Sequence, residues 1–141
     1  HKAFAQVQAD GEIRLFRSHR PDYRDGEQER DFVYVKDVVD MTLHVAAHRA
    51  SGLFNMGTGR AHTWLDLVRP IFAALDLPER ITFIDMPERL RDTYQYHTLA
   101  DVSRLRQVGY AAAPTPLAEA VTEYVRDYLL PGRYLGDEPP L

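Results

Sequence analysis

Apolar side chains in this 141-residue chain follow two different spacings. Residues 12–16 alternate polar and apolar side chains, which predicts a half-buried strand. Short apolar runs at residues 31–35, 53–56 and 81–85 predict three more strands, and residues 94–99 are expected to be extended. Elsewhere apolar side chains recur every three or four residues, as they do in amphipathic helices. The helices that this spacing predicts cover residues 1–10, 37–50, 64–76, 101–108 and 115–130.

Turn and capping residues stand at the ends of these segments. Gly11 and Gly109 follow two predicted helices, at the position where a residue in the left-handed conformation often ends a helix. Asp and Thr side chains commonly accept hydrogen bonds from the first free amides of a helix. The residues in this capping position are Asp37, Thr63, Asp101 and Thr115, with Pro116 then at the first helical position. Short strands and helices that alternate along a chain of this length predict a single α/β domain.

Residues 17–29 form a long polar segment between two predicted strands, with Pro21 and Gly26 inside it. We expect this segment to be a surface loop. Loops of ~12 residues or more are uncommon in compact domains and often carry function. The end of the chain, residues 131–141, is rich in proline and glycine and is predicted to be a flexible tail. The folded domain is therefore expected to cover residues 1–130.

Composition and charge narrow the classes of function. The chain has 17 basic and 21 acidic residues, a formal net charge of −4, and no block of lysines or arginines. We therefore expect neither a nucleic acid nor a membrane as its partner, and no apolar run approaches the ~18 residues that span a bilayer. Without cysteine there is no disulfide, thiolate metal site or cysteine nucleophile. His44 and His48 have the spacing of a zinc pair, but no third ligand stands out, so no metal site is expected.

Two motifs in a fixed order carry a family resemblance. Arg30-Asp-Phe-Val-Tyr-Val-Lys-Asp37 is followed, after a predicted helix, by Leu53-Phe-Asn-Met-Gly-Thr-Gly59. This order resembles the C-terminal substrate domain of the extended short-chain dehydrogenase/reductases, the nucleotide-sugar epimerases and dehydratases. Pro87-Glu-Arg-Leu-Arg-Asp-Thr-Tyr-Gln95 and Glu119-Ala-Val-Thr-Glu-Tyr124 are most similar to the branch that acts on an ADP-linked heptose. The resemblance covers nearly the whole chain, and it implies a small mixed α/β substrate-binding domain that lacks most or all of the Rossmann domain.

The resemblance also implies a substrate site. In the family, the ADP of the substrate lies between the end of a strand, the arginine of the Arg-Asp motif and a tyrosine of a later loop. The corresponding positions in this chain are Phe16, Arg17, Ser18, His19, Arg30 and Tyr94. The family usually has a Glu-Gly-Ser turn after the phenylalanine, whereas this chain has arginine, serine and histidine there, followed by a longer loop.

Elementary chemistry favours two of these positions independently of the resemblance. Arginine offers a planar fork of donors that can pair with a diphosphate; the alternative is that Arg30 pairs with Asp31 or Glu29 at the surface. Tyr94 can stack on a base and donate a hydrogen bond, or it can be a half-buried strand aromatic. The turn at residues 57–59 could hold a phosphate, but Gly-x-Gly is a weak signal, and a turn between a strand and a helix explains it.

The catalytic motifs of the family are not in this chain. Its glycines cannot form the dinucleotide fingerprint Gly-x-x-Gly-x-x-Gly, and neither Lys2 nor Lys36 completes a Tyr-x-x-x-Lys pair. We therefore assign no catalytic and no cofactor-binding residue here. The resemblance implies that both, together with tightly held NADP, belong to the protein's own N-terminal Rossmann domain upstream of His1, and that this fragment alone is inactive.

By the same resemblance, the full-length protein is expected to be an NADP-dependent epimerase that acts at C6″ of an ADP-linked heptose for the inner core of lipopolysaccharide. Its expected location is cytoplasmic, its substrate an ADP-sugar, and its assembly a homo-oligomer. Two alternatives stay open at this point. One is a related epimerase or dehydratase that acts on a UDP-, GDP- or dTDP-sugar, and the other is a non-catalytic nucleotide-sugar-binding module.

Overall fold

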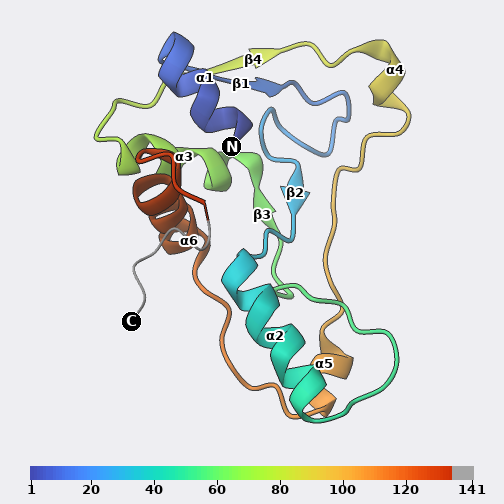
Figure 1. The fold of residues 1–141 in the computed structure, drawn as a ribbon. Helices are drawn as coiled ribbons and strands as arrows, with labels where there is room; N and C mark the ends of the chain where they lie inside the picture. The colour runs from blue at the N-terminus through green and yellow to red at the C-terminus, as the bar shows by residue number, and fades with distance from the viewer. Residues whose placement is uncertain (135–141) are drawn as a thin grey trace.

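The computed structural model describes residues 1–134. Its elements in chain order are α1 (Lys2–Asp10), β1 (Ile13–Phe16), β2 (Glu29–Arg30), α2 (Val35–Ala47), β3 (His62–Thr63), α3 (Trp64–Ala74), β4 (Ile81–Ile84), α4 (Glu88–Arg91), α5 (Ser103–Gln107), α6 (Leu117–Glu123) and the π-helix η1 (Tyr124–Leu129). Strands β1 and β4 run parallel, whereas β2 and β3 run antiparallel. Figure 1 shows α1, α3 and α6 gathered with β1 and β4 at one end, α2 and α5 at the other, and β2 and β3 between them. This arrangement confirms the predicted small mixed α/β fold.

The larger hydrophobic core lies between α1, β1, α3 and η1. Ile13, Val68, Phe72 and Val125 are buried there against one another. Removing a side chain of this size from water stabilises a fold by roughly 1.5–3 kcal/mol. This core therefore fixes the end of β1, where the predicted substrate site begins.

Local sequence signals set the borders of several elements as predicted. The Thr63 hydroxyl accepts a hydrogen bond from the amide of Asp66 (3.0 Å), and the Asp66 carboxylate accepts one from the amide of Thr63 (2.9 Å). This capping box satisfies two amides at the start of α3. Gly11 ends α1 in the left-handed region, with φ 71°. The predictions of α1, β1, α3 and β4 are confirmed.

The second core joins α2 and α5. Met41 of α2 and Leu105 of α5 are buried together with Tyr110, whose hydroxyl donates a hydrogen bond to the Asp40 carboxylate (2.8 Å). Burial, together with this bond, raises the pKa of Tyr110 to about 12. The helices predicted at 37–50 and 101–108 are present with different borders.

The predicted strand at 31–35 is wrong, and so are three predicted helix caps: Asp37, Asp101, since Val102 takes the capping position of α5, and Thr115. Strand β2 ends at Arg30 and helix α2 already begins at Val35, so Asp37 lies in the first turn of the helix. Its carboxylate accepts hydrogen bonds from the amide (2.8 Å) and the hydroxyl (2.7 Å) of Thr115. Asp37 lies inside α2 and Thr115 lies one residue before Pro116, which takes the capping position of α6, so neither caps a helix.

One further predicted strand is absent. Residues 53–56 form no strand with any described segment, and a strand exists only where another backbone pairs with it. Residues 94–99, expected to be extended, belong to no helix. Between β4 and Tyr94 the chain forms the short helix α4. Of the predicted tail 131–141, residues 135–141 lie outside the described residues.

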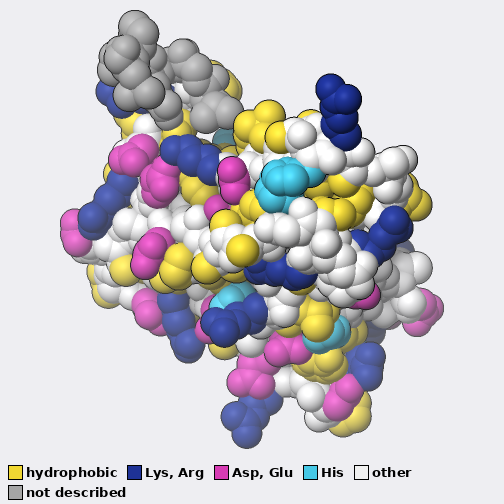
Figure 2. All heavy atoms as spheres, turned by 90° about the horizontal axis from the view of Figure 1, so that it is seen from below, with side chains coloured by type: hydrophobic (Ala, Val, Ile, Leu, Met, Phe, Trp, Pro, Cys, Tyr) yellow, Lys and Arg dark blue, Asp and Glu magenta, His cyan; other side chains and the backbone are white. Residues whose placement is uncertain are grey.

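Large apolar side chains lie exposed along one face of α2. Val35, Val39 and Leu43 are 53%, 47% and 62% exposed, and Leu53 on the following loop is 87% exposed. Figure 2 looks up at the end of the molecule that carries α2 and α5, and hydrophobic side chains reach the surface there between charged ones. Among the described residues, no helix is long and apolar enough to cross a bilayer.

Candidate functional site

The candidate site is a cavity of about 300 Å³ between α1, the end of β1 and the start of α3. Its walls are mainly apolar and come from segments far apart in the sequence. The lining residues include Ala3, Ile13, Leu15, Phe16, Gln28, Trp64, Leu67, Val68 and Tyr94, with Lys2 and Arg14 as the charged members. Two of the six predicted substrate residues, Phe16 and Tyr94, therefore line the same cavity.

Phe16, Tyr94 and Arg30 form one stack beside this cavity. The rings of Phe16 and Tyr94 lie edge to face with centroids 6.4 Å apart, and the Arg30 guanidinium carbon lies 5.3 Å from the centre of the Tyr94 ring. A cation over an aromatic face is attracted by the ring. The structure thus brings together three predicted site residues that are up to 78 positions apart (94 minus 16).

Among the described residues, the hydrogen bonds of the Arg30 guanidinium go only to backbone oxygens. It donates to the carbonyl of Glu29 (2.6 Å) and to the carbonyl of Gln95. Within residues 1–134 it forms no ion pair with a carboxylate, so the alternative of a surface pair with Asp31 or Glu29 is not observed. A positive charge without a neighbouring carboxylate is available to an anionic ligand.

The other three predicted residues, Arg17, Ser18 and His19, form a turn outside the cavity wall. The amide of Arg17 donates to the carbonyl of Ile84 (2.8 Å), which continues the pairing of β1 with β4. The Arg17 guanidinium bonds to Asp25 (3.1 Å), and the amide of Ser18 bonds to the same carboxylate (2.7 Å). The charge of Arg17 is therefore shared with an acidic side chain, unlike that of Arg30.

Asp31, next to Arg30, forms hydrogen bonds to two distant segments of the chain, at residues 58–59 and at Ala100. One of its oxygens accepts hydrogen bonds from the amide (2.9 Å) and hydroxyl (2.6 Å) of Thr58, and the other from the amides of Gly59 (2.9 Å) and Ala100 (3.1 Å). Burial by itself would raise the pKa of Asp31, but these four hydrogen bonds together hold it below its ordinary value. The ionised Asp31 carboxylate thus links three parts of the chain by hydrogen bonds.

The glycine turn at residues 57–59 supplies backbone amides that donate hydrogen bonds to Asp31. A Cβ atom at Gly57 would lie 2.4 Å from the Cβ of Ala100 and 2.8 Å from an oxygen of Asp31, so only glycine fits there. The amides of Thr58 and Gly59 already donate to Asp31. They are not free to bind a phosphate, which favours the structural explanation of this motif.

Gln28 and Trp64 are cavity residues that the sequence reasoning missed. Gln28 is 1% exposed, and its side-chain amide donates to the carbonyl of Phe16 (3.3 Å). Its side-chain oxygen and the indole nitrogen of Trp64 are buried and have no hydrogen-bond partner among residues 1–134. Two signals could have found them: Gln28 stands two residues before Arg30, and Trp64 directly follows a helix cap.

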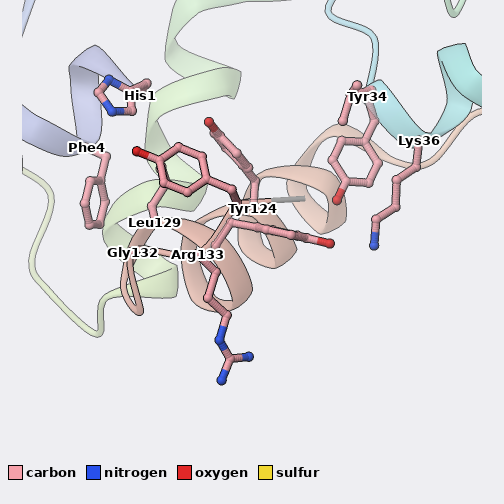
Figure 3. A pocket seen from close by; sticks show the side chains of 11 residues that line it. His1, Phe4, Tyr34, Lys36, Tyr124, Leu129, Gly132 and Arg133 are labelled. Carbon is pink, nitrogen blue, oxygen red and sulfur yellow. The ribbon is translucent and has the colours of Figure 1, made fainter. Parts of the chain in front are cut away.

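A second cavity, of about 270 Å³, is a weaker candidate. Figure 3 shows His1 and Phe4 on its α1 side, and Tyr34 and Lys36 at the start of α2 on the other. The Lys36 ammonium pairs with Glu123 at 2.5 Å, and this hydrogen bond raises the pKa of Lys36. None of the six predicted residues lines this cavity, and its lysine is already neutralised.

His44 and His48 are occupied by contacts within the fold. Their rings stack with centroids 3.9 Å apart. A ring nitrogen of His44 forms a hydrogen bond with the carbonyl of Val108 (3.0 Å), and one of His48 with the carbonyl of His44 (2.9 Å). Within the described part of the chain, no three His, Asp or Glu side chains are placed to hold a metal ion.

Residues 2–57 match the model of the NAD dependent epimerase/dehydratase family. The chain is similar to ADP-L-glycero-D-manno-heptose-6-epimerase of Nitratidesulfovibrio vulgaris (strain DP4), with 50% identity over 129 residues that make up 91% of this chain. The chain spans 40% of the length of that relative.

Solved structures agree with this assignment. Helicobacter pylori ADP-L-glycero-D-manno-heptose-6-epimerase aligns with a TM-score of 0.67 and 25% identity, over 92% of this chain and 35% of that one. The UDP-N-acetylglucosamine 4-epimerase of Methanobrevibacter ruminantium M1, in complex with UDP-N-acetylmuramic acid, aligns with a TM-score of 0.73 and 22% identity, over 93% of this chain and 39% of that one. The fold that the motifs predicted is confirmed, and the match to the family model agrees with the predicted resemblance.

The family is NAD dependent by its description, but the residues described here do not fit a dinucleotide. A dinucleotide site of this kind needs free backbone amides in a glycine-rich turn. In the Gly-x-Gly turn of this chain the amides of Thr58 and Gly59 are bonded to Asp31, and the side chain of Ala100 lies against Gly57. No chemical step is therefore assigned here to the cofactor.

Proposed function

We propose that this chain is the substrate-binding part, residues 1–130, of an NADP-dependent ADP-L-glycero-D-manno-heptose 6-epimerase. The full-length enzyme would interconvert ADP-D-glycero- and ADP-L-glycero-D-manno-heptose at C6″ for the inner core of lipopolysaccharide. The observation that carries the proposal is the Arg30 guanidinium, stacked on Tyr94 beside an apolar cavity and without a carboxylate partner among the described residues. The 50% identity with the Nitratidesulfovibrio vulgaris relative supports an ADP-heptose as the ligand.

The proposed site holds a nucleotide by complementary surfaces. The apolar cavity beside Phe16 and Tyr94 would take the base or ribose, since aromatic rings stack on flat ring systems and bury their surface. Arg30, next to Tyr94, would pair with the diphosphate through its planar donors. The turn at residues 17–19 adjoins Phe16 and would border the ligand. Orientation of a substrate in this way contributes several kcal/mol to catalysis.

The rest of the full-length protein would supply the catalytic residues. This chain holds no Tyr-x-x-x-Lys pair, and it spans only 40% of the length of its relative. We infer that the N-terminal Rossmann domain packs against the exposed face of α2 that Val35, Val39 and Leu43 form. Apolar side chains at successive helical turns need a covering surface.

A related epimerase of a UDP-sugar is the second candidate. The higher TM-score, 0.73, belongs to a UDP-N-acetylglucosamine 4-epimerase bound to a UDP-sugar. Arg30 and the cavity are compatible with any nucleoside diphosphate. The two candidate functions therefore differ in which base, adenine or uracil, the site prefers. Side-by-side affinities of the full-length protein for ADP and UDP separate them.

The test of the proposal is the affinity of full-length protein variants for ADP-heptose. Replacing Arg30 with alanine removes a charge-assisted, bidentate contact, at a cost on the order of 2–3 kcal/mol. We expect a roughly thirty- to 150-fold loss of affinity, and only partial recovery with Arg30→Lys, because an ammonium lacks the planar fork. NADP affinity should not change.

Arg69→Ala is the matched control, because Arg69 pairs with Glu79 (3.4 Å) on the surface away from the cavity. It should leave ADP-heptose affinity unchanged. Equal affinity in wild type, Arg30→Ala and Arg30→Lys would reject the assignment of the site.

A further inference from the structure

Tyr96 links the two segments that would border the substrate. It is 6% exposed, and its hydroxyl accepts a hydrogen bond from the amide of His19 (2.9 Å). Its ring lies 5.4 Å from that of Tyr94, nearly perpendicular to it. One buried side chain therefore touches both the turn at 17–19 and the tyrosine proposed to stack on the nucleotide.

The backbone of Tyr96 is fixed relative to Arg30. The amide of Glu29 donates to the carbonyl of Tyr96 (2.8 Å), and the amide of Thr98 donates to the carbonyl of Glu29 (3.3 Å). Two residues further on, the amide of Ala100 donates to Asp31 (3.1 Å). Residues 96–100 thus run alongside β2 in a set register, although they form no regular strand.

The first residues of the loop at 17–28, which Tyr96 contacts, form few other hydrogen bonds with the rest of the described protein. The Arg20 guanidinium lies 5.1 Å from the centre of the Tyr96 ring and pairs with Asp22 inside the loop. The ring of Tyr23 packs against Tyr96 with centroids 5.3 Å apart. The amide of Arg17 donates to Ile84, outside the loop. The next backbone hydrogen bond from the loop to a residue outside it is the one that the amide of His19 donates to the hydroxyl of Tyr96.

We propose that Tyr96 is a positioning residue of the substrate site: its hydroxyl holds the turn at 17–19 in place beside Phe16 and Tyr94 before the ligand arrives. This inference rests on the proposed function. Without the hydroxyl the turn samples more conformations, and the ligand must order it on binding, which lowers affinity. The chemical step should be unaffected, because the proposed function places the catalytic residues outside this chain.

The experiment compares Tyr96→Phe with Tyr110→Phe in the full-length protein. Tyr110 is the matched control because it is equally buried, 5% exposed, and its hydroxyl also makes one hydrogen bond, to Asp40 at 2.8 Å. Both substitutions remove one hydroxyl and keep the ring. For Tyr96→Phe we expect KM for ADP-heptose to rise about three- to tenfold, the loss from one hydrogen bond, with kcat within about twofold of wild type. Tyr110→Phe should leave KM unchanged.

Hydrogen exchange of the His19 amide in the free protein is the second measurement. It should become faster in Tyr96→Phe and stay as in wild type in Tyr110→Phe. Unchanged exchange, a faster exchange without a rise in KM, or the same rise in KM for both variants would each overturn the proposal. If wild-type protein bound no ADP-sugar, the proposed function would fail, while the exchange rate of His19 would still report whether Tyr96 holds the turn.

Discussion

Replacing Asp31 with asparagine should destabilise the protein far more than a change of one atom suggests. Each carboxylate oxygen of Asp31 accepts two hydrogen bonds, one pair from Thr58 and the other from the amides of Gly59 and Ala100. An asparagine has a single acceptor oxygen, so in either orientation its NH₂ group faces two donors. With the NH₂ group toward Thr58, the hydroxyl can reverse its role, but the Thr58 amide loses its acceptor, and the hydrogen bonds that remain no longer go to a charged group. We expect a total loss of about 1–3 kcal/mol.

Asp37→Asn is the matched control. Its two oxygens accept one hydrogen bond each, from the amide and from the hydroxyl of Thr115. An asparagine can accept from the amide and donate to the hydroxyl, which can reverse its role. We therefore expect a loss below ~1 kcal/mol for this variant.

Urea unfolding of the chain, followed by fluorescence of its single tryptophan, Trp64, measures both changes. The pH dependence gives an independent check. The folded-state pKa of Asp31 lies below its ordinary value, so its stabilisation is present above the unfolded-state pKa of about 3.9 and is lost as the pH falls through the lower folded-state pKa. The difference between wild type and Asp31→Asn should shrink over that range. Equal losses for the Asp31 and Asp37 variants, or a difference that stays constant down to pH 2, would refute this reasoning.

Two further predictions concern the chain outside its full-length context. The isolated chain should show no epimerase turnover and bind no NADP, because it lacks both the glycine fingerprint and Tyr-x-x-x-Lys; stoichiometric NADP in the purified chain, measured by absorbance or calorimetry, would contradict this. It should also self-associate through the exposed face of α2, and Leu43→Glu should shift it toward monomer in sedimentation experiments. A wild-type chain that stays monomeric at high concentration, or an unchanged assembly in the variant, would count against a role for that face.

Segments whose structure depends on neighbours in sequence could be predicted. The capping box at Thr63 and the left-handed Gly11 are local devices, and the elements beside them were predicted correctly. The strand predicted at 31–35 was wrong for a physical reason. Its apolar side chains suit a strand, but α2 begins at Val35, and the oxygens of Asp31 bond to residues 58, 59 and 100 rather than to a neighbouring strand.

The residues of the candidate site also fall into those that the sequence predicts and those that it does not. Phe16, Arg30 and Tyr94 could be named from motifs, and the structure places them together. Tyr96 could not, because its contact with His19 joins positions 77 residues apart and depends on how the loop at 17–28 folds back. The hydrogen bond between Asp37 and Thr115 could not be predicted for a related reason, since no sequence pattern connects these two positions.

The loop at 17–28 is anchored so that its middle can change without disturbing its ends. At the far end, the amides of Leu65 and Trp64 donate to the carbonyls of Gly26 and Gln28, each at 3.2 Å. Lengthening a loop that is held at both ends costs little stability, since the entropy of closing it grows only slowly with length. An insertion beside Pro21 should therefore be tolerated, provided that it keeps the contacts of Arg20 and Tyr23 with the ring of Tyr96.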